Sequence, residues 1–134
     1  MGEVSKLGVD KLQKDSTANI SLFLYDEFLK NSDKYKSVSY FRRSPGGNLL
    51  MFKIMHKYFL NERLCVEELI RQVPITIASR LSLFTLIDTA VKKGILEKKS
   101  LNGSDRRKKH IIPTETFVKE YKDWLQHYIN EISS

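Results

Sequence analysis

Apolar residues recur at helical spacing near both ends of the chain. Residues 1–15 are polar and show no period, so we expect them to form a flexible leader. The pattern then predicts a helix over 16–33, for which Ser16 or Thr17 can serve as the N-cap. A strongly amphipathic helix is predicted over 114–132, where aromatic and aliphatic residues fall on one face.

The segment between these helices predicts shorter elements. Residues 34–48 contain the run Ser-Pro-Gly-Gly, which favours a connector over a continuous helix. Residues 49–60 are apolar on most sides and predict a buried helix. A short bridging strand at 64–66 and a brief helix at 67–72, which ends before a proline, complete this part.

A longer helix is predicted at about 79–93, followed by Gly94 in the place of a left-handed C-terminal cap residue. At 100° per residue, one side of this helix is apolar. The opposite side carries short hydroxylated side chains and ends in a basic one: Ser82, Thr85, Thr89 and Lys92. Such a face can approach another surface closely, although an ordinary solvent-exposed face has a similar composition.

Two short strands are expected between the long helix and the last one. Residues 95–100 alternate weakly, 101–104 have turn chemistry, and 108–112 return as a second strand. Thr114 can then cap the final helix, with Glu115 favourable in its first turn. The fold class expected is mainly α with a small β hairpin.

Charge is concentrated in the same region. The 134 residues carry a formal charge of +7, and the span from Lys92 to His110 alone holds eight basic residues against two acidic ones. A local excess of this kind attracts polyanions, although basic faces that only contact solvent are also common. The aromatic and basic residues at 40–43 either contact nucleic acid or anchor a loop on the core.

Several functional classes are disfavoured by the composition. No apolar run is long enough to span a bilayer, and the first residues lack the apolar stretch of a signal peptide, so we expect a cytoplasmic protein. Cys65 is the only cysteine and is expected to be packed. The three histidines lack ligand spacing and no glycine-rich phosphate loop occurs. We therefore expect no catalytic site, no metal and no cofactor.

The two terminal helices carry more apolar surface than a small helical core requires. We therefore expect 16–33 and 114–132 to pair with each other and, across a two-fold axis, with a second copy of the chain. The alternative is that both helices close over their own domain.

These features resemble a winged helix-turn-helix of the MarR type. Residues 86–98, Leu-Ile-Asp-Thr-Ala-Val-Lys-Lys-Gly-Ile-Leu-Glu-Lys, are similar to that family's recognition-helix end, glycine and first wing strand. Ser-Asp-Arg-Arg at 104–107 resembles its wing motif, and the step from Asp105 to Thr114 matches its usual length. The resemblance covers residues 49–132. It departs from the family in a longer segment before Gly94 and in the lack of a glycine soon after the threonine.

The resemblance implies a single winged-helix domain over 16–134, with a DNA-binding core at 49–113 and flanking dimerisation helices. It further implies a transcriptional regulator that binds double-stranded DNA sequence-specifically, with the recognition helix at 79–93 in the major groove and the wing at 100–109 on the minor groove or backbone. The expected DNA contacts are Ser79, Arg80, Ser82, Thr85, Thr89, Lys92, Lys98, Arg106, Arg107, Lys108 and Lys109. Asp105 would orient a wing arginine by a salt bridge.

A homodimer would bind an imperfect palindrome, because two recognition helices would lie about one DNA turn apart. The resemblance also implies a small-molecule effector near the dimer interface, but no cluster in the sequence indicates which. The rival hypothesis is a winged helix that serves as a protein- or RNA-interaction module of a replication or transcription complex.

Overall fold

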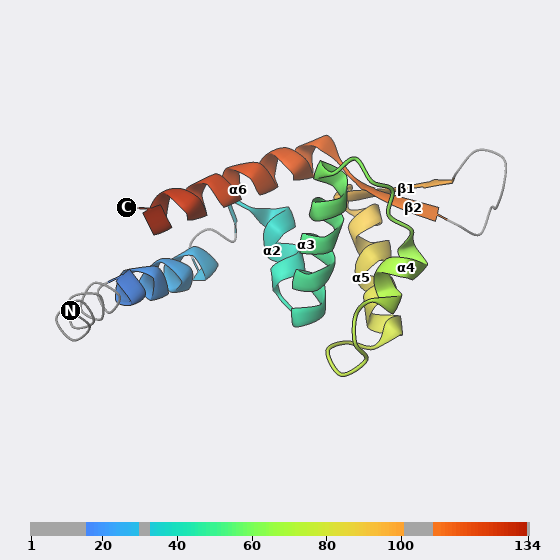
Figure 1. Cartoon of the computed structure of the whole chain (residues 1–134), viewed down its shortest axis with the longest axis horizontal. Coiled ribbons are helices and arrows are strands. Elements are labelled where there is room, and N and C mark those ends of the chain that lie inside the picture. Colours follow the sequence, from blue (N-terminus) through green and yellow to red (C-terminus); the bar gives the residue numbers. More distant parts are fainter. Residues whose placement is uncertain (1–15, 30–32, 101–108, 134) are drawn as a thin grey trace, which may run out of the picture.

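The computed structural model describes residues 16–29, 33–100 and 109–133, and the chain is mainly helical with one antiparallel hairpin (Figure 1). Residues 16–29 form the N-terminal helix. The elements that follow are α2 (Lys36–Arg42), α3 (Pro45–Phe59), α4 (Val66–Arg71), α5 (Arg80–Lys92), β1 (Leu96–Ser100), β2 (Lys109–Pro113) and α6 (Glu115–Ser133). The expected fold class is confirmed. No helix in the described ranges combines the length and apolar character that crossing a bilayer requires.

The expected connector at 34–48 was wrong, because most of it is helical. It contains α2 and the first turn of α3, which begins at Pro45 and not at residue 49. Ser44 is the N-cap of α3, and its side chain accepts a hydrogen bond from the Gly47 amide at 3.1 Å. Proline suits the first position of a helix, since its missing N–H has no partner there in any case. The run that looked like a helix breaker is therefore a helix start.

The two glycines of that run allow the close packing of α3. A Cβ on Gly47 would lie 2.1 Å from the carbonyl oxygen of Phe41 in α2. A Cβ on Gly46 would lie 2.9 Å from the Cβ of Ala78. Both distances are shorter than real carbon contacts, so glycine at these positions lets α2 and the segment before α5 approach α3.

The core lies where α2, α3, α5 and α6 meet, and β1 and β2 cover one end of it. Phe41 of α2 and Phe117 of α6 stack there with ring centroids 5.6 Å apart, and both are fully buried. The other fully buried large side chains are Val38, Leu50, Met51, Ile54, Met55, Leu69, Leu83, Ile87 and Leu96. Because the core draws on every part of the chain from α2 onward, α5 is held from several sides.

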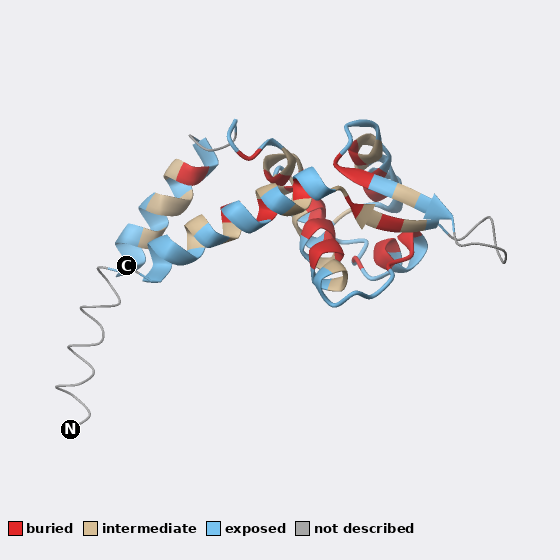
Figure 2. Cartoon of the chain, turned by 90° about the horizontal axis from the view of Figure 1, so that it is seen from above, coloured by how far each residue is buried: buried red, intermediate tan, exposed pale blue. Residues whose placement is uncertain are grey.

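The hairpin is fixed to the helices by a third short segment. Leu96 pairs with Pro113 at one end of the ladder and Ser100 with Lys109 at the other. Cys65 forms an isolated antiparallel bridge with His110 where the bridging strand at 64–66 was expected, and the bridge is shorter than expected because Val66 begins α4. In both views the hairpin projects from the end of the molecule opposite the terminal helices (Figures 1 and 2).

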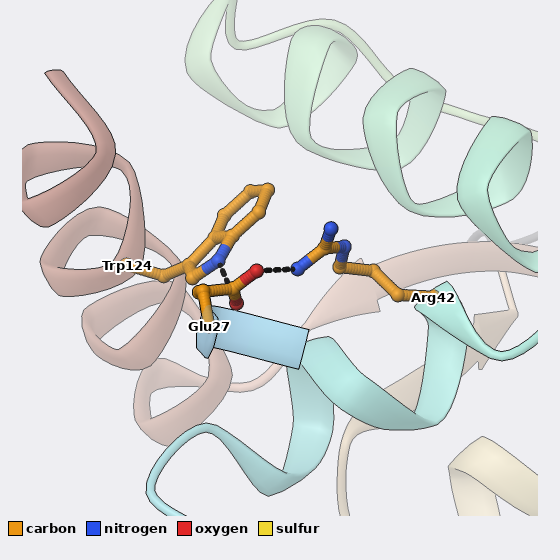
Figure 3. Close-up of polar contacts among 3 residues, drawn as sticks. All are labelled: Glu27, Arg42 and Trp124. Carbon is orange, nitrogen blue, oxygen red and sulfur yellow. Dashed lines mark hydrogen bonds and ion pairs between the residues drawn. The ribbon is translucent and has the colours of Figure 1, made fainter. Parts of the chain in front are cut away.

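A buried polar cluster anchors the N-terminal helix (Figure 3). Glu27 is only 4% exposed; it is ion-paired with Arg42 of α2 and accepts a hydrogen bond from the indole nitrogen of Trp124 in α6 at 2.7 Å. The Arg42 guanidinium also lies 5.0 Å from the centre of a Trp124 ring. Arg42 therefore joins three helices, and with Phe41 buried the anchoring interpretation of residues 40–43 is the one that the contacts favour.

The two terminal helices lie side by side and extend away from the rest of the fold (Figures 1 and 2). Phe23 contacts His127 and Tyr128 of α6, with ring centroids 5.4 and 5.5 Å apart. Even so, large apolar side chains on both helices stay exposed, namely Leu22, Tyr25, Phe28, Leu29, Ile129 and Ile132. The pairing of the two helices within one chain leaves an apolar surface uncovered.

Candidate nucleic-acid interface

Helix α5 has well-defined ends. Ser79 is its N-cap in extended conformation, and its side chain accepts a hydrogen bond from the Ser82 amide at 3.1 Å. At the other end Gly94 has φ of +78°, and its amide and that of Ile95 donate to the carbonyls of Val91 and Ala90. This is a Schellman motif, and it confirms the expected left-handed glycine.

One face of α5 packs on the core and the other is open. Leu83, Ile87 and Ala90 are fully buried, as the helical spacing predicts. The opposite side carries Ser82, Thr85 and Lys92 of the expected DNA-contacting set, and all three are exposed. Arg80 stands seven residues before Ile87 and so falls on the packed side by helical angle, but it is exposed as the first residue of the helix. Except for the contacts of Ser82 with its cap residue, these four residues make no side-chain hydrogen bond or ion pair to any described residue. The polar part of α5 is thus available to a partner.

Thr89 differs from the other hydroxylated residues of α5 because it is half-buried beside α2. The Tyr40 hydroxyl donates to the Leu86 carbonyl at 2.6 Å and also forms a hydrogen bond with the Thr89 side chain. Burial raises the pKa of Tyr40, and the bond with Thr89 partly opposes that increase. Thr89 therefore lies at the margin of the open face, with its hydroxyl already used within the fold.

Exposed apolar residues that were not expected from the sequence lie in and just before the N-terminal part of α5. Leu81 is 78% exposed and Ile75 is 77% exposed, and Ile77 and Phe84 are also exposed. Leu81 stands four residues before Thr85, so helical geometry places both on the same face. Leu81 lies about 160° around the helix from the buried Leu83, and this angle is the sequence signal for its exposure.

The basic residues of the hairpin differ in how available they are to a phosphate. Lys98 of β1 is ion-paired with Asp88 of α5, which reduces its availability to a phosphate. Lys109, at the start of β2, is exposed and has no ion-pair partner among the described residues. Asp105, Arg106, Arg107 and Lys108 lie outside the described residues, so their expected roles in the wing stay predictions.

Thr114 does not cap α6 in the expected way. It precedes α6, and its carbonyl accepts the amide of Val118 at 2.9 Å, but its hydroxyl donates backwards to the carbonyls of Gly94 and Ile95 at 2.9 and 3.1 Å. The short polar side chain therefore links the end of α5 to the start of α6. Serine or threonine at an N-cap normally accepts from the helix amides, so the local sequence gave no sign of this arrangement.

No cluster of His, Cys, Asp and Glu in the described ranges could hold a metal ion. No protein-family model, curated protein or solved structure matches the chain. The resemblance to winged helices of the MarR type therefore depends on the residues and on the order of helices and hairpin.

Proposed function

We propose that the chain is a sequence-specific double-stranded DNA-binding protein that regulates transcription, with α5 entering the major groove and the hairpin contacting the minor groove or backbone. The observation that carries this proposal is the open face of α5, on which Thr85 and Lys92 are exposed and unpaired within the described structure, together with Arg80, which is exposed and unpaired at the first position of the helix. A guanidinium and short hydroxyls at the N-terminal part of a helix suit base edges. The order of α3, α4, α5 and a hairpin is compatible with a winged helix.

The charge distribution supports the same proposal. Most of the formal charge of the chain falls in the span from Lys92 to His110, which begins at the end of α5 and includes β1 and the first two residues of β2. Lysines there would neutralise phosphates, which supplies affinity and salt dependence but little sequence preference. Arg80 on α5 would supply the discrimination between bases.

We further propose that the protein acts as a homodimer through its terminal helices. Leu22, Tyr25 and Leu29 follow one another at steps of three and four residues and are each about 60% exposed. Ile129 and Ile132 of α6 are also exposed. Exposing an apolar stripe of this kind to water is unfavourable in free energy. A second copy of the chain carries the same stripe and can cover it in a two-fold symmetric dimer. Such a dimer would favour an imperfect palindrome.

The test is to select bound sites from a random pool of duplexes and to measure the affinity for the selected site at several salt concentrations. We expect enrichment of an imperfect palindrome and a linear fall of log affinity with log salt, with a slope that reflects the phosphates contacted. Random duplex is the control and should bind more weakly. No enrichment together with a flat salt response would contradict the proposal.

One observation favours a second candidate, a winged helix that binds another protein. Ile75, Ile77, Leu81 and Phe84 form an exposed apolar group at the end of α5 that would face DNA. Exposed apolar groups often mark protein interfaces, whereas DNA interfaces are polar and basic. If no duplex is enriched from the random pool and the wild-type chain shows no salt-dependent binding to random duplex, this second candidate is favoured.

A further inference from the structure

Leu81 is the most exposed large apolar side chain of α5. It is 78% exposed, compared with 37% for Phe84, whereas Leu83 and Ile87 of the same helix are fully buried. Single apolar side chains on a protein surface are common and carry no information by themselves. What a leucine at this place can do depends on the part of the helix surface that it occupies and on the charges around it.

Helical geometry places Leu81 near the middle of the open face of α5. At 100° per residue, its side chain leaves the helix about 40° from that of Thr85 and about 20° from that of Lys92. The fully buried Ala90 lies on the opposite side of the helix. Ser82 lies about 100° away from Leu81. Leu81 is therefore closer to the centre of the open face than Ser82, one of the hydroxylated residues expected to contact DNA.

The charged side chains along this face are basic or already paired. Lys92 is exposed and makes no hydrogen bond or ion pair with a described residue. The carboxylate of Asp88, which also falls on this face, is ion-paired with Lys98 of β1. Arg80 is exposed directly before Leu81 in the sequence. A face that is positive along its length and apolar near one end is complementary to a polyanion that presents an apolar group at one point.

Duplex DNA has such a group. The 5-methyl group of thymine is the one apolar group that the base edges present in the major groove, where all other edge atoms within reach are hydrogen-bond donors or acceptors. An aliphatic side chain over a donor or acceptor would displace its water and leave it unpaired, which is unfavourable. Because the N-terminal residues of a groove-reading helix make most of its base contacts, a leucine in the first turn favours a thymine beneath it.

We propose that Leu81 recognises a thymine methyl group in each half-site of the duplex that the protein binds. This inference rests on the proposed DNA-binding function and adds to it one of the bases that α5 selects. Arg80 would discriminate by hydrogen bonds to a base edge, whereas Leu81 would discriminate by apolar contact alone. A thymine that is read in this way is distinguished from cytosine and from uracil by its methyl group.

The test uses the duplex selected from the random pool, with deoxyuridine in place of one symmetric pair of thymines at a time. Deoxyuridine keeps the base-pairing edge of thymine and lacks only the 5-methyl group. We expect one symmetric pair at which this replacement weakens binding of the wild-type chain by about tenfold, since burial of each methyl group contributes about fourfold to affinity. The affinity for each duplex is measured by fluorescence anisotropy at one fixed salt concentration.

Variants assign the methyl contact to a side chain. Leu81→Ala should bind the thymine duplex about tenfold more weakly than the wild-type chain and should bind the duplex with deoxyuridine at that pair almost as well as the thymine duplex. Ile75→Ala is the matched control, because Ile75 is 77% exposed but precedes the helix. It should keep the full response to deoxyuridine. Circular dichroism verifies the helical content of both variants.

Two results would overturn the inference while DNA binding itself stands. One is the absence of any thymine pair whose methyl groups affect the affinity. The other is a response of Leu81→Ala to deoxyuridine as large as that of the wild-type chain. A wild-type chain that binds no duplex would instead overturn the proposed function together with this inference.

Discussion

At the scale of single residues, the lack of a Cβ at Gly47 allows the close contact between α3 and α2. In an open helix interior, replacing glycine by alanine stabilises a protein by about 1 kcal/mol. A Cβ at Gly47 would instead lie 2.1 Å from the Phe41 carbonyl oxygen, so the backbone of α2 has to move. We therefore expect Gly47→Ala to lower the free energy of unfolding by about 2 kcal/mol or more, measured by urea unfolding.

Gly94 is the matched comparison because its constraint is conformational. A Cβ there would meet nothing within 4 Å, but φ is +78°. Gly94→Ala should cost about 1 to 2 kcal/mol, and Gly94→Asn should cost less, because asparagine tolerates the left-handed region. At position 47 the order should be reversed, so that Gly47→Asn lowers the free energy of unfolding more than Gly47→Ala does. The same order of the two substitutions at both sites would contradict these assignments.

Glu27 joins the N-terminal helix to α2 and α6. Glu27→Ala would leave Arg42 and the indole N–H of Trp124 without their buried partner, at a cost of about 3 kcal/mol. Glu27→Gln keeps an acceptor for the indole and should cost less. The chain has one tryptophan, so urea unfolding followed by its fluorescence reports on this cluster directly.

Asp123→Ala, an exposed acidic residue of α6, serves as the control for removing a carboxylate. It should change the free energy of unfolding by less than about 0.5 kcal/mol. If Glu27→Ala behaves like this control, the cluster does not hold the helix.

At the scale of elements, the exposed stripe on residues 16–29 predicts the effect of charge on assembly. Leu22→Glu together with Leu29→Glu would place two carboxylates in the proposed apolar interface, and we expect the dimer dissociation constant to rise at least about tenfold. Sedimentation velocity would measure this, with circular dichroism to verify the helical content. Thr17→Glu adds a charge to the same helix away from the stripe and should leave assembly unchanged. An equal change of the dimer dissociation constant in Thr17→Glu and in the double variant would contradict the proposed interface.

The sequence could predict α4, α5, the hairpin and α6 to within one or two residues, since each has clear periodicity and end signals. It could not predict α2, because a seven-residue helix has few periods and lies directly before Ser44 and Pro45. Proline and glycine occur both where helices end and where helices begin, so their presence alone does not distinguish the two. What decides between them here is the contact of Gly47 with Phe41, which is a property of the folded chain.

At the scale of the whole molecule, the proposed roles of α5 in base discrimination and of the hairpin in phosphate contact can be tested separately by measuring DNA binding. In the proposed binding mode, Arg80→Ala should relax the preference for the selected site over random duplex by about tenfold, because it would remove a base contact. Lys109→Ala should weaken both duplexes by a similar factor and reduce the salt slope by about one. The readout is the affinity for the two duplexes. Equal loss of preference in both variants would contradict these roles.

The polar part of the candidate interface was predictable because helical angles alone separate Leu83 and Ile87 from Thr85 and Lys92. The partial burial of Thr89 was not predictable, because the neighbouring Tyr40 belongs to α2, a helix that the sequence pattern did not reveal. The hollow lined by Arg63, Leu64, His110 and Ile111 was equally unpredictable, because its walls come from segments about fifty residues apart that meet only through strand pairing.

The hydrogen bonds of Thr114 have a mechanical consequence. They tie the residue before α6 to the two residues that follow the C-cap of α5, so the direction in which α6 leaves is coupled to the orientation of α5. With 19 residues, α6 is about 28 Å long, so a tilt of about 10° at Thr114 would displace its far end by about 5 Å. In a dimer joined through that far end, small rotations at this one hydroxyl would change the separation of the two α5 helices, and with it the length of DNA that both can span.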